Sequence, residues 1–185
     1  KRQLDEVRAE DLNISREDVR RISRMAGIAY QEVYNGPSLT LCIFLLQAGS
    51  RLPLHDHPDM HVLGRLLFGR MRVLSFDPLQ SCKNQPIGSK WASLRSDSVI
   101  GPMPITYSLG PNEGNIHEIQ ALEDSAFFDV LTPPYNSNEE RDCTYYSCEQ
   151  VGTTSNGAPL CILSPTHPHN FAMVTQPYRG PEFKM

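Results

Sequence analysis

Two histidines separated by a single residue are the part of this sequence best suited to chemistry. His55 and His57 lie within residues 49–61. Residues two apart in an extended strand project from the same face of that strand. If the face lines the interior of a barrel, both imidazoles can bind one metal ion, and neutral imidazole suits iron, zinc, copper or nickel. The same spacing also arises by chance on an exposed strand, so the pair alone leaves that reading open.

The glycines around this pair make a wider pattern. Gly49 precedes His55 by six residues, and Gly69 follows His57 by twelve. This spacing resembles the first motif of the cupin superfamily, which predicts a β-barrel with the histidines inside it. The motif usually contains a glutamate that also binds the metal, but Val62 stands at that position. The carboxylate ligand of many cupins is therefore missing.

A third histidine follows in the second half of the predicted barrel. The segment from Pro111 through Gly114 to His117 resembles the second cupin motif, although one extra residue separates Pro111 from Gly114 and Ala121 replaces the usual asparagine. A lone histidine would more often be an ordinary core or surface residue. Together with the first motif, the spacing predicts that His117 binds the same metal ion.

Three neutral histidines would occupy one face of an octahedral ion and leave up to three positions open. The ion would keep its double positive charge and would therefore favour an anionic ligand such as a thiolate. With Fe(II), substrate and dioxygen could bind side by side, whereas zinc could activate water for hydrolysis. The ligand set by itself leaves both metals open.

Three further histidines are not expected to bind this metal. His61 is expected to be a neighbour that lies outside the ligand set. His167 and His169 are again two residues apart, but prolines flank them in a tail that we expect to lack strand character. We therefore predict no metal site in the tail.

The five cysteines are odd in number and form no pair separated by two residues, so they predict free thiols in a reducing, cytoplasmic compartment. Cys42 lies in an apolar strand and is expected in the core. The sequence around Cys82, Cys148 and Cys161 indicates nothing beyond free thiols.

The elements that must position these residues are mostly short strands separated by turn signals. The sequence predicts a single, mainly β domain: a cupin-type double-stranded β-barrel (jelly roll) with a short N-terminal helical segment. We expect a helical cap over 1–27, the barrel over 28–151 and a polar, proline-rich tail over 152–185 that packs on the barrel. The strands expected are 29–34, 38–47, 52–57, 61–68, 70–76, 90–95, 106–109, 116–121, 126–132 and 144–151.

The helical segment has its own start and stop signals. Ser15 can cap a helix that ends at Gly27. Between them, Val19, Ile22 and Met25 recur at helical spacing and are expected to form one apolar stripe.

Composition excludes several classes of protein. The chain has 185 residues, 39% of them hydrophobic, which is enough for one domain with a core. Its formal net charge of −4 gives no reason to expect nucleic acid or an anionic membrane as a partner. The longest apolar run, Leu41 to Leu46, is far shorter than the roughly 20 residues that span a bilayer. No signal peptide is visible, but the chain begins at Lys1, which leaves an upstream segment open. We expect a monomer.

Longer stretches are similar to one particular family. They include Pro53-Leu-His-Asp-His-Pro-Asp-Met-His61, Asn115-Ile-His-Glu-Ile119, Phe128-Asp-Val-Leu-Thr-Pro-Pro-Tyr135, Arg141-Asp-Cys-Thr-Tyr-Tyr146 and Pro177-Tyr-Arg-Gly-Pro181. These segments resemble the thiol dioxygenases, the family of animal cysteamine (2-aminoethanethiol) dioxygenases and plant cysteine oxidases. The resemblance covers essentially the whole chain and is closest to the animal enzymes.

The resemblance implies a particular metal and reaction. It implies that His55, His57 and His117 hold a non-haem Fe(II), with O2 as co-substrate. The thiol of cysteamine, or of an N-terminal cysteine on a protein, would receive both oxygen atoms and become a sulfinic acid. In that family, oxidation of N-terminal cysteine marks proteins for degradation through the N-degron pathway, so the resemblance also implies a role in oxygen sensing.

The resemblance further implies roles for residues near the metal. Asp129 would orient the substrate amine or a metal-bound ligand, the alternative being a structural hydrogen bond. Tyr135 matches a substrate-pocket tyrosine, the alternative being an ordinary half-buried aromatic residue. Cys143 and Tyr145 match a pair that can form a thioether cross-link near the iron, and they would tune catalysis with Asp129; the alternative is two unlinked neighbours. Asp59 replaces a family glycine and could alter the mouth of the site.

Two functions of other classes stay open from the residues alone. One is a zinc- or nickel-dependent cupin hydrolase or isomerase, and the other is a non-catalytic cupin binding module. The absence of the usual glutamate weakens the metal-dependent alternatives without excluding them. The sequence also does not distinguish small thiols from protein N-termini as substrates.

Overall fold

The computed structural model describes residues 2–23, 25–79 and 88–183. Two short α-helices, α1 (Arg2–Glu6) and α2 (Arg16–Arg20), precede the strands. The strands that follow are β1 (Gly27–Asn35), β2 (Thr40–Leu46), β3 (Arg51–His55), β4 (His61–Phe68), β5 (Met71–Pro78), β6 (Lys90–Ile100), β7 (Ile105–Leu109), β8 (Ile116–Ala121), β9 (Ser125–Thr132), β10 (Tyr146–Thr153), β11 (Pro159–Pro165) and β12 (Ala172–Thr175). Single 3-10 turns lie at Glu10–Leu12 and Ser137–Glu139. None of the described helices is long and apolar enough to cross a membrane.

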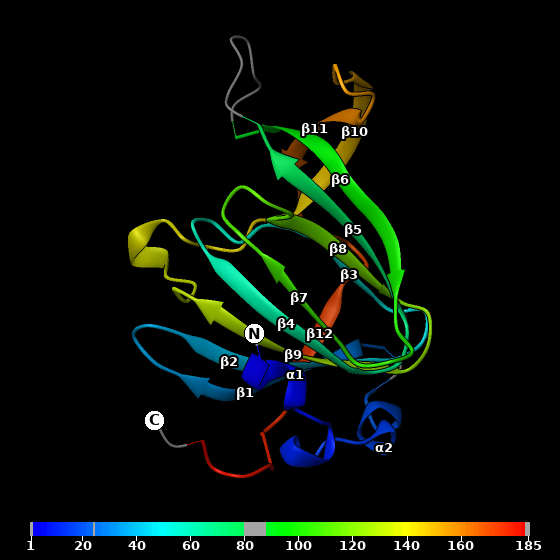
Figure 1. The fold of residues 1–185 in the computed structure, drawn as a ribbon, viewed down its shortest axis with the longest axis vertical. Helices are drawn as coiled ribbons and strands as arrows, with labels where there is room; N and C mark the ends of the chain where they lie inside the picture. The colour runs from blue at the N-terminus through cyan, green and yellow to red at the C-terminus, as the bar shows by residue number, and fades with distance from the viewer. Residues whose placement is uncertain (1, 24, 80–87, 184–185) are drawn as a thin grey trace.

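The strands form two curved sheets that face each other (Figure 1). The first sheet has the order β12-β1-β2-β9-β4-β7, and the second has the order β10-β11-β6-β5-β8-β3. The central strands pair in nested antiparallel fashion, β2 with β9, β3 with β8, β4 with β7 and β5 with β6. This nesting divides eight strands between two layers and defines a jelly roll. The predicted fold class is confirmed.

The first sheet is buried on both of its faces. Its outer face carries Ala29, Ile43, Leu45 and Phe128, which join one apolar cluster with buried residues of the N-terminal segment such as Val19. Figure 1 shows the helices beneath β1, β2 and β9, on the side away from the second sheet. The N-terminal segment therefore covers an apolar surface that the barrel alone would leave exposed to water.

The N-terminal helix is shorter than its sequence predicted. Ser15 begins it as expected, because its backbone N–H and its hydroxyl both donate to the Asp18 carboxylate at 2.8 and 2.6 Å. However, α2 ends at Arg20, and Met25 is 93% exposed rather than part of an apolar stripe. The chain must leave the helix early because Gly27, with a φ of +69°, already begins strand β1.

The tail does contain strands, which corrects the expectation that it lacks them. Strand β11 pairs with both β10 and β6, and β12 adds to β1 in parallel. Strand β11 forms where the tail has apolar residues, because Cys161 and Leu163 are buried against the second sheet. After β12 the chain returns to the N-terminal segment, where Asn13 donates to the carbonyl of Arg179 at 3.1 Å. The division into cap, barrel and tail stays a prediction.

A glycine in β4 allows the side chain of a tyrosine in β7 to lie over the inner face of the first sheet. Gly64 is paired with Tyr107 of β7 on one side and with Asp129 of β9 on the other. The Tyr107 ring lies over Gly64, and its hydroxyl donates to Asp129 Oδ1 at 3.0 Å. A Cβ atom at position 64 would lie 2.0 Å from the Tyr107 ring. Only glycine leaves room for this contact.

We therefore expect Gly64→Ala to displace Tyr107 and to lower the free energy of unfolding by about 1–3 kcal/mol, the usual cost of overpacking. Gly152→Ala is the matched control, because no atom lies within 4 Å of the Cβ position there. Urea unfolding of both variants measures the difference. Equal stabilities for the two variants would contradict the close approach of Tyr107 to Gly64.

Candidate metal centre

Three histidine side chains converge inside the second sheet. His55 is the last residue of β3, and it is paired with His117 of β8. Strand β3 ends at His55, two residues before the end of the predicted strand 52–57, so His57 lies in the loop that follows. The His57 ring nevertheless lies beside the other two rings. One ring nitrogen from each histidine lies within 4.8 Å of the others, and the three residues are 6%, 4% and 3% exposed. The structure brings together the three predicted ligands, and these residues can hold a metal ion.

Backbone carbonyls orient two of the three rings. His55 Nδ1 lies 2.7 Å from the carbonyl oxygen of Pro53, and His57 Nδ1 lies 3.2 Å from that of Asn115. Because a carbonyl only accepts, each Nδ1 must carry the proton and donate it. The Nε2 lone pair of both rings is therefore available to a metal ion.

Asn115 ties the loop that carries His57 to the strand that carries His117. Its side chain accepts from the backbone N–H of His57 at 3.1 Å and donates to the His57 carbonyl at 2.7 Å. This buried amide was not predicted to have a role. Its place in the motif two residues before His117 was the available signal.

All three imidazoles are held in their neutral form. Burial lowers the pKa of His55, and it lowers the pKa of His57 to about 3 with help from the neighbouring His55. Burial and the other two rings also hold the pKa of His117 well below its usual range. Only neutral imidazole binds a metal, so the cluster is ready as a ligand set at neutral pH.

The chemistry of the donor set fits a metal ion. His117 Nδ1 is buried without a hydrogen bond of ordinary geometry in the described part of the chain, although the Gly114 backbone lies close enough to oppose the lowering of its pKa. One nitrogen of each of these buried, neutral rings converges on a common point, an arrangement that a metal ion would complete. Val62, at the position of the missing glutamate, lies in an apolar cluster with Cys42, Met60 and Leu131. The donor set is therefore three neutral nitrogens.

A cavity of about 290 Å³ opens over the three rings. The second sheet contributes His55 and His117, the loop after β3 contributes His57, and the first sheet contributes most of the opposite wall. The lining residues other than the histidines are Tyr30, Glu32, Asn35, Thr40, Phe44, Leu52, Phe127, Asp129, Leu131, Tyr135, Cys143, Tyr145 and Met173. The pocket is therefore lined by all seven residues to which the sequence assigned site roles.

Asp129 is a buried carboxyl group, only 5% exposed, in the wall that faces the histidines. Burial raises its pKa to about 7, and the hydrogen bond from Tyr107 opposes this rise. Tyr107 is the neighbour that makes the burial tolerable, because a buried carboxyl group is costly without a hydrogen-bond partner. The sequence did not single out Tyr107, since the contact depends on the pairing of β4 with β7 and β9.

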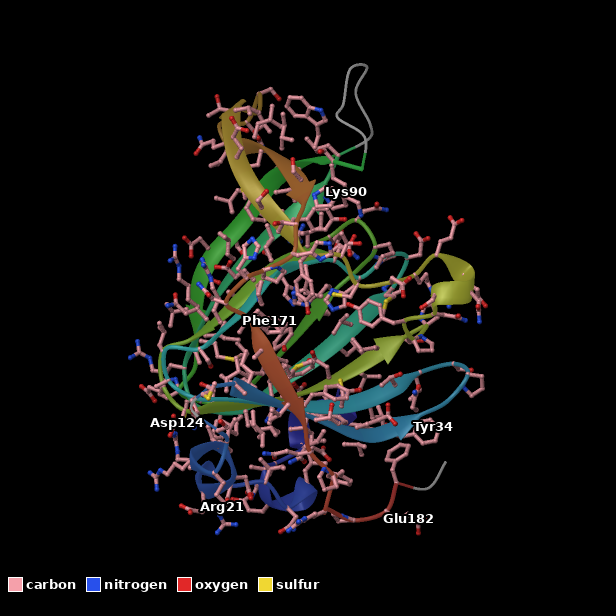
Figure 2. The ribbon with its side chains drawn as sticks, turned by 180° about the vertical axis from the view of Figure 1, so that it is seen from behind. Arg21, Tyr34, Lys90, Asp124, Phe171 and Glu182 are labelled. Atoms are coloured by element: carbon pink, nitrogen blue, oxygen red, sulfur yellow. The ribbon has the colours of Figure 1, made fainter. Side chains whose placement is uncertain are left out.

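The segment before β10 lies over the cluster. The Tyr145 ring lies 6.0 Å from the His55 ring, and the Tyr135 ring lies 5.6 Å from the His57 ring. Burial raises the pKa of the Cys143 thiol to about 11 and that of Tyr145 to about 12, and the latter is raised further by Cys143. Tyr145 also contacts Phe171, its ring 5.4 Å away, which Figure 2 labels at the start of β12.

Asp56, between the two histidines, holds this segment in place. It is 1% exposed, and its carboxylate accepts from Lys90 Nζ at 2.6 Å, from the Tyr146 hydroxyl at 2.8 Å and from the Thr144 backbone N–H at 2.9 Å. Its carbonyl accepts from the Tyr135 hydroxyl at 2.8 Å. The sequence analysis missed this residue, because its partners are distant in the chain.

Other residues considered as site candidates lie apart from the cluster. His61, His167 and His169 are exposed, and none belongs to a metal-binding group among the described residues. Asp59 is exposed and does not line the cavity. Its φ of +55° lies in the left-handed region, which explains why glycine would suit this position.

The cysteines outside the pocket segment are also accounted for where the structure describes them. Cys42 is buried as expected, Cys161 is buried as well, and Cys148 is an exposed free thiol. Cys82 lies outside the described residues.

The fold and the site together define a jelly-roll barrel with a buried cluster of three histidines that can hold a metal ion. A family model described as PCO_ADO matches residues 3–183, and the chain belongs to this family. The chain is 29% identical to 2-aminoethanethiol dioxygenase of Mus musculus, over 97% of this chain and 81% of the relative. It is 32% identical to plant cysteine oxidase 2 of Arabidopsis thaliana, over 77% of this chain and 54% of the relative.

Solved structures include a more distant match. It is an uncharacterized conserved protein with a double-stranded beta-helix domain from Klebsiella pneumoniae, 13% identical, with a TM-score of 0.47 over 71% of this chain and 94% of that chain.

The lowered histidine pKa values predict that the metal-free protein loses stability in acid. The unfolded chain binds protons at histidine near pH 6.5, whereas folded His57 binds one only near pH 3. The free energy of unfolding should therefore fall as the pH drops below about 6.5, by up to about 1.4 kcal/mol per pH unit for each such histidine. Urea unfolding between pH 7.5 and 5 measures this slope.

His57→Gln should flatten the slope, whereas His61→Gln, at an exposed position, should leave it unchanged. Asp129 acts in the opposite sense because its pKa is raised, but it is common to all three proteins. Identical slopes for His57→Gln and the unaltered protein would contradict the neutral, buried cluster.

The contacts of Asp56 predict that it holds Cys143 in place. Asp56→Ala leaves the Tyr146 hydroxyl and the Thr144 N–H without their partner, so it should lower the free energy of unfolding by about 2–4 kcal/mol. It should also speed the alkylation of Cys143 in the metal-free protein, because the segment loosens and the thiol pKa falls from about 11. Peptide mass spectrometry follows alkylation at each cysteine.

Asp97→Ala serves as the matched control, because it removes a carboxylate from an exposed ion pair with Arg72 on the same sheet. Alkylation of Cys148 is the internal standard. If Cys143 reacted at the same rate in Asp56→Ala and Asp97→Ala, Asp56 would not position the segment.

Proposed function

We propose that this protein is an Fe(II)-dependent thiol dioxygenase that converts the thiol of cysteamine or of an N-terminal cysteine to a sulfinic acid. The observation that carries the proposal is the buried set of three neutral histidines facing a carboxyl group across one pocket. Family membership and the names of its relatives support it. The reaction adds one O2 to one thiol, so that R–SH becomes R–SO2H without any other reductant.

Fe(II) held by His55, His57 and His117 would supply a redox-active centre at which a thiol and dioxygen can meet. Three neutral ligands suit an anionic thiolate, because no protein carboxylate among them offsets the charge of the ion. The apolar part of the lining, such as Phe44 and Phe127, limits water around the reacting sulfur.

Asp129 would bind the substrate amine. Its carboxylate faces the histidines, and the Tyr107 hydroxyl holds one of its oxygens at 3.0 Å. An ammonium group there would favour the ionised carboxylate and fix the direction in which the substrate lies. Tyr135 would complete this side of the pocket with its ring, while its hydroxyl remains bonded to Asp56.

Cys143 and Tyr145 would tune the reaction from the remaining side of the pocket. Both line the cavity. Burial raises the pKa of the Cys143 thiol and of the Tyr145 hydroxyl, so both groups stay protonated at neutral pH. A thioether between them would remove two hydrogen atoms, with dioxygen as the oxidant. We include this cross-link in the proposal.

The cellular role follows from the same proposal. Fe(II) and free thiols persist in a reducing compartment, so we place the protein in the cytoplasm, acting as a monomer on aminothiols or on Cys-initiated protein N-termini. Oxidation of such N-termini would couple oxygen supply to protein degradation through the N-degron pathway.

The experiment that tests the function incubates the iron-loaded protein, in air, with cysteamine or with a Cys-initiated peptide. Mass spectrometry should show the addition of two oxygen atoms to the thiol substrate, both labelled when 18O2 is supplied. No addition should occur without oxygen. If neither thiol gains oxygen, the proposal is wrong.

His117→Ala should lose both bound iron and activity, because two histidines leave the ion without one side of its ligand set. His61→Ala, an exposed position outside the cluster, should keep both. Metal analysis and oxygen uptake measure the two properties separately. A His117→Ala protein that retained iron and activity would refute the ligand assignment.

A further inference from the structure

The pocket contains a second carboxylate that the proposed reaction leaves unused. Glu32 lies in β1, and it lines the cavity together with Tyr30, its neighbour on the same strand face. The intervening Gln31 is buried on the opposite face, as strand alternation requires. Glu32 itself is exposed, so its carboxylate lies where the pocket meets solvent.

Strand register fixes where Glu32 lies relative to Asp129. Glu32 is paired with Cys42 of β2, and Cys42 is paired with Asp129 of β9. The two carboxylates therefore lie in one row on the inner face of the first sheet, two strands and about 10 Å apart. Asp129 lies at the buried end of this row and Glu32 at its open end.

The charge of Glu32 has no partner among the residues that the structure describes. Its side chain makes no hydrogen bond or ion pair in the described ranges, and no lysine or arginine lines the cavity. Its negative charge helps to raise the pKa of Tyr30 and of Cys42, after the larger effect of burial. The carboxylate therefore acts on the interior of the pocket rather than only on solvent.

Cysteamine does not account for this arrangement. Cysteamine has four heavy atoms, one of them its amine nitrogen. This single amine cannot reach both Asp129 and Glu32 when the two carboxylates are about 10 Å apart. The cavity of about 290 Å³ also exceeds its needs, since each water-sized atom group takes about 30 Å³. A peptide spans the distance, because it rises about 3.3 Å per residue and a lysine adds a flexible four-carbon stem.

We infer that Glu32 forms a second anionic subsite, which binds a cationic side chain on the residue after an N-terminal cysteine. This inference rests on the proposed function and narrows its substrate class to Cys-initiated peptides with lysine or arginine in the second position. Asp129 binds the terminal ammonium group, and Glu32 binds the side chain of the second residue.

The test compares two peptides that differ only in their second residue, Cys-Lys and Cys-Glu, each followed by the same neutral sequence. An exposed ion pair contributes up to about 1 kcal/mol, which is about fivefold, and replacing attraction by repulsion enlarges the difference. The unaltered protein should therefore prefer the Cys-Lys peptide by about 5- to 20-fold in kcat/KM, and less at high salt.

Glu32→Gln should reduce this preference to less than about twofold, and Glu32→Lys should reverse it. Glu149→Gln is the matched control, because Glu149 is an exposed glutamate of β10 that does not line the cavity. It should keep the full preference. Equal kcat/KM for both peptides in the unaltered protein, or an unchanged preference in Glu32→Gln, would overturn the inference.

Binding separates this inference from the proposed function. Dissociation constants of the two peptides for the metal-free protein, measured by calorimetry without oxygen, should show the same order and the same dependence on Glu32. If no thiol is oxidised but this binding order holds, the reaction is wrong and the subsite stands. If both peptides are oxidised but bind equally well, the subsite is wrong and the reaction stands.

Discussion

Three imidazole rings buried within contact of one another are the constraint on which the rest of this structure depends. Each must stay neutral, because protonation would bury a charge beside two other rings. Each must also point its free nitrogen inward, which the carbonyls of Pro53 and Asn115 arrange for His55 and His57. The second sheet supplies this arrangement by pairing β3 with β8 at His55 and His117. A metal ion bound by the three nitrogens would make such burial favourable.

The wall of the pocket opposite the histidines carries a buried carboxyl group. The jelly roll places the first sheet over the histidines, and the inner face of that sheet carries Asp129. Burying this carboxyl group requires Tyr107, and the path of Tyr107 requires a glycine at position 64. In the function we propose, metal binding and substrate orientation would come from different sheets, so the distance between the sheets would set where a substrate amine and thiol can lie.

A third set of contacts joins the pocket segment to the metal loop. Asp56 lies between two ligands, yet its carboxylate faces away from them toward Lys90, Thr144 and Tyr146. A displacement of the segment that carries Cys143 and Tyr145 would therefore move the loop that carries His57, and a displacement of the loop would move the segment. The base of the β10–β11 hairpin, near Lys90 in Figure 2, belongs to the site for this reason.

The sequence by itself determined the fold class, the family and the three histidines, because local spacing and turn residues carry that information. It predicted α2 too long and missed strands β11 and β12. The end of α2 at Arg20, the pairing of β12 with β1 and the pairing of β11 with β10 and β6 all depend on the rest of the barrel. Only the tertiary structure assigned partners to Asp56 and Tyr107. The Asp56 contacts to Thr144 and Tyr146 join residues 88 and 90 positions apart, and strand register, which no local pattern encodes, decides such contacts.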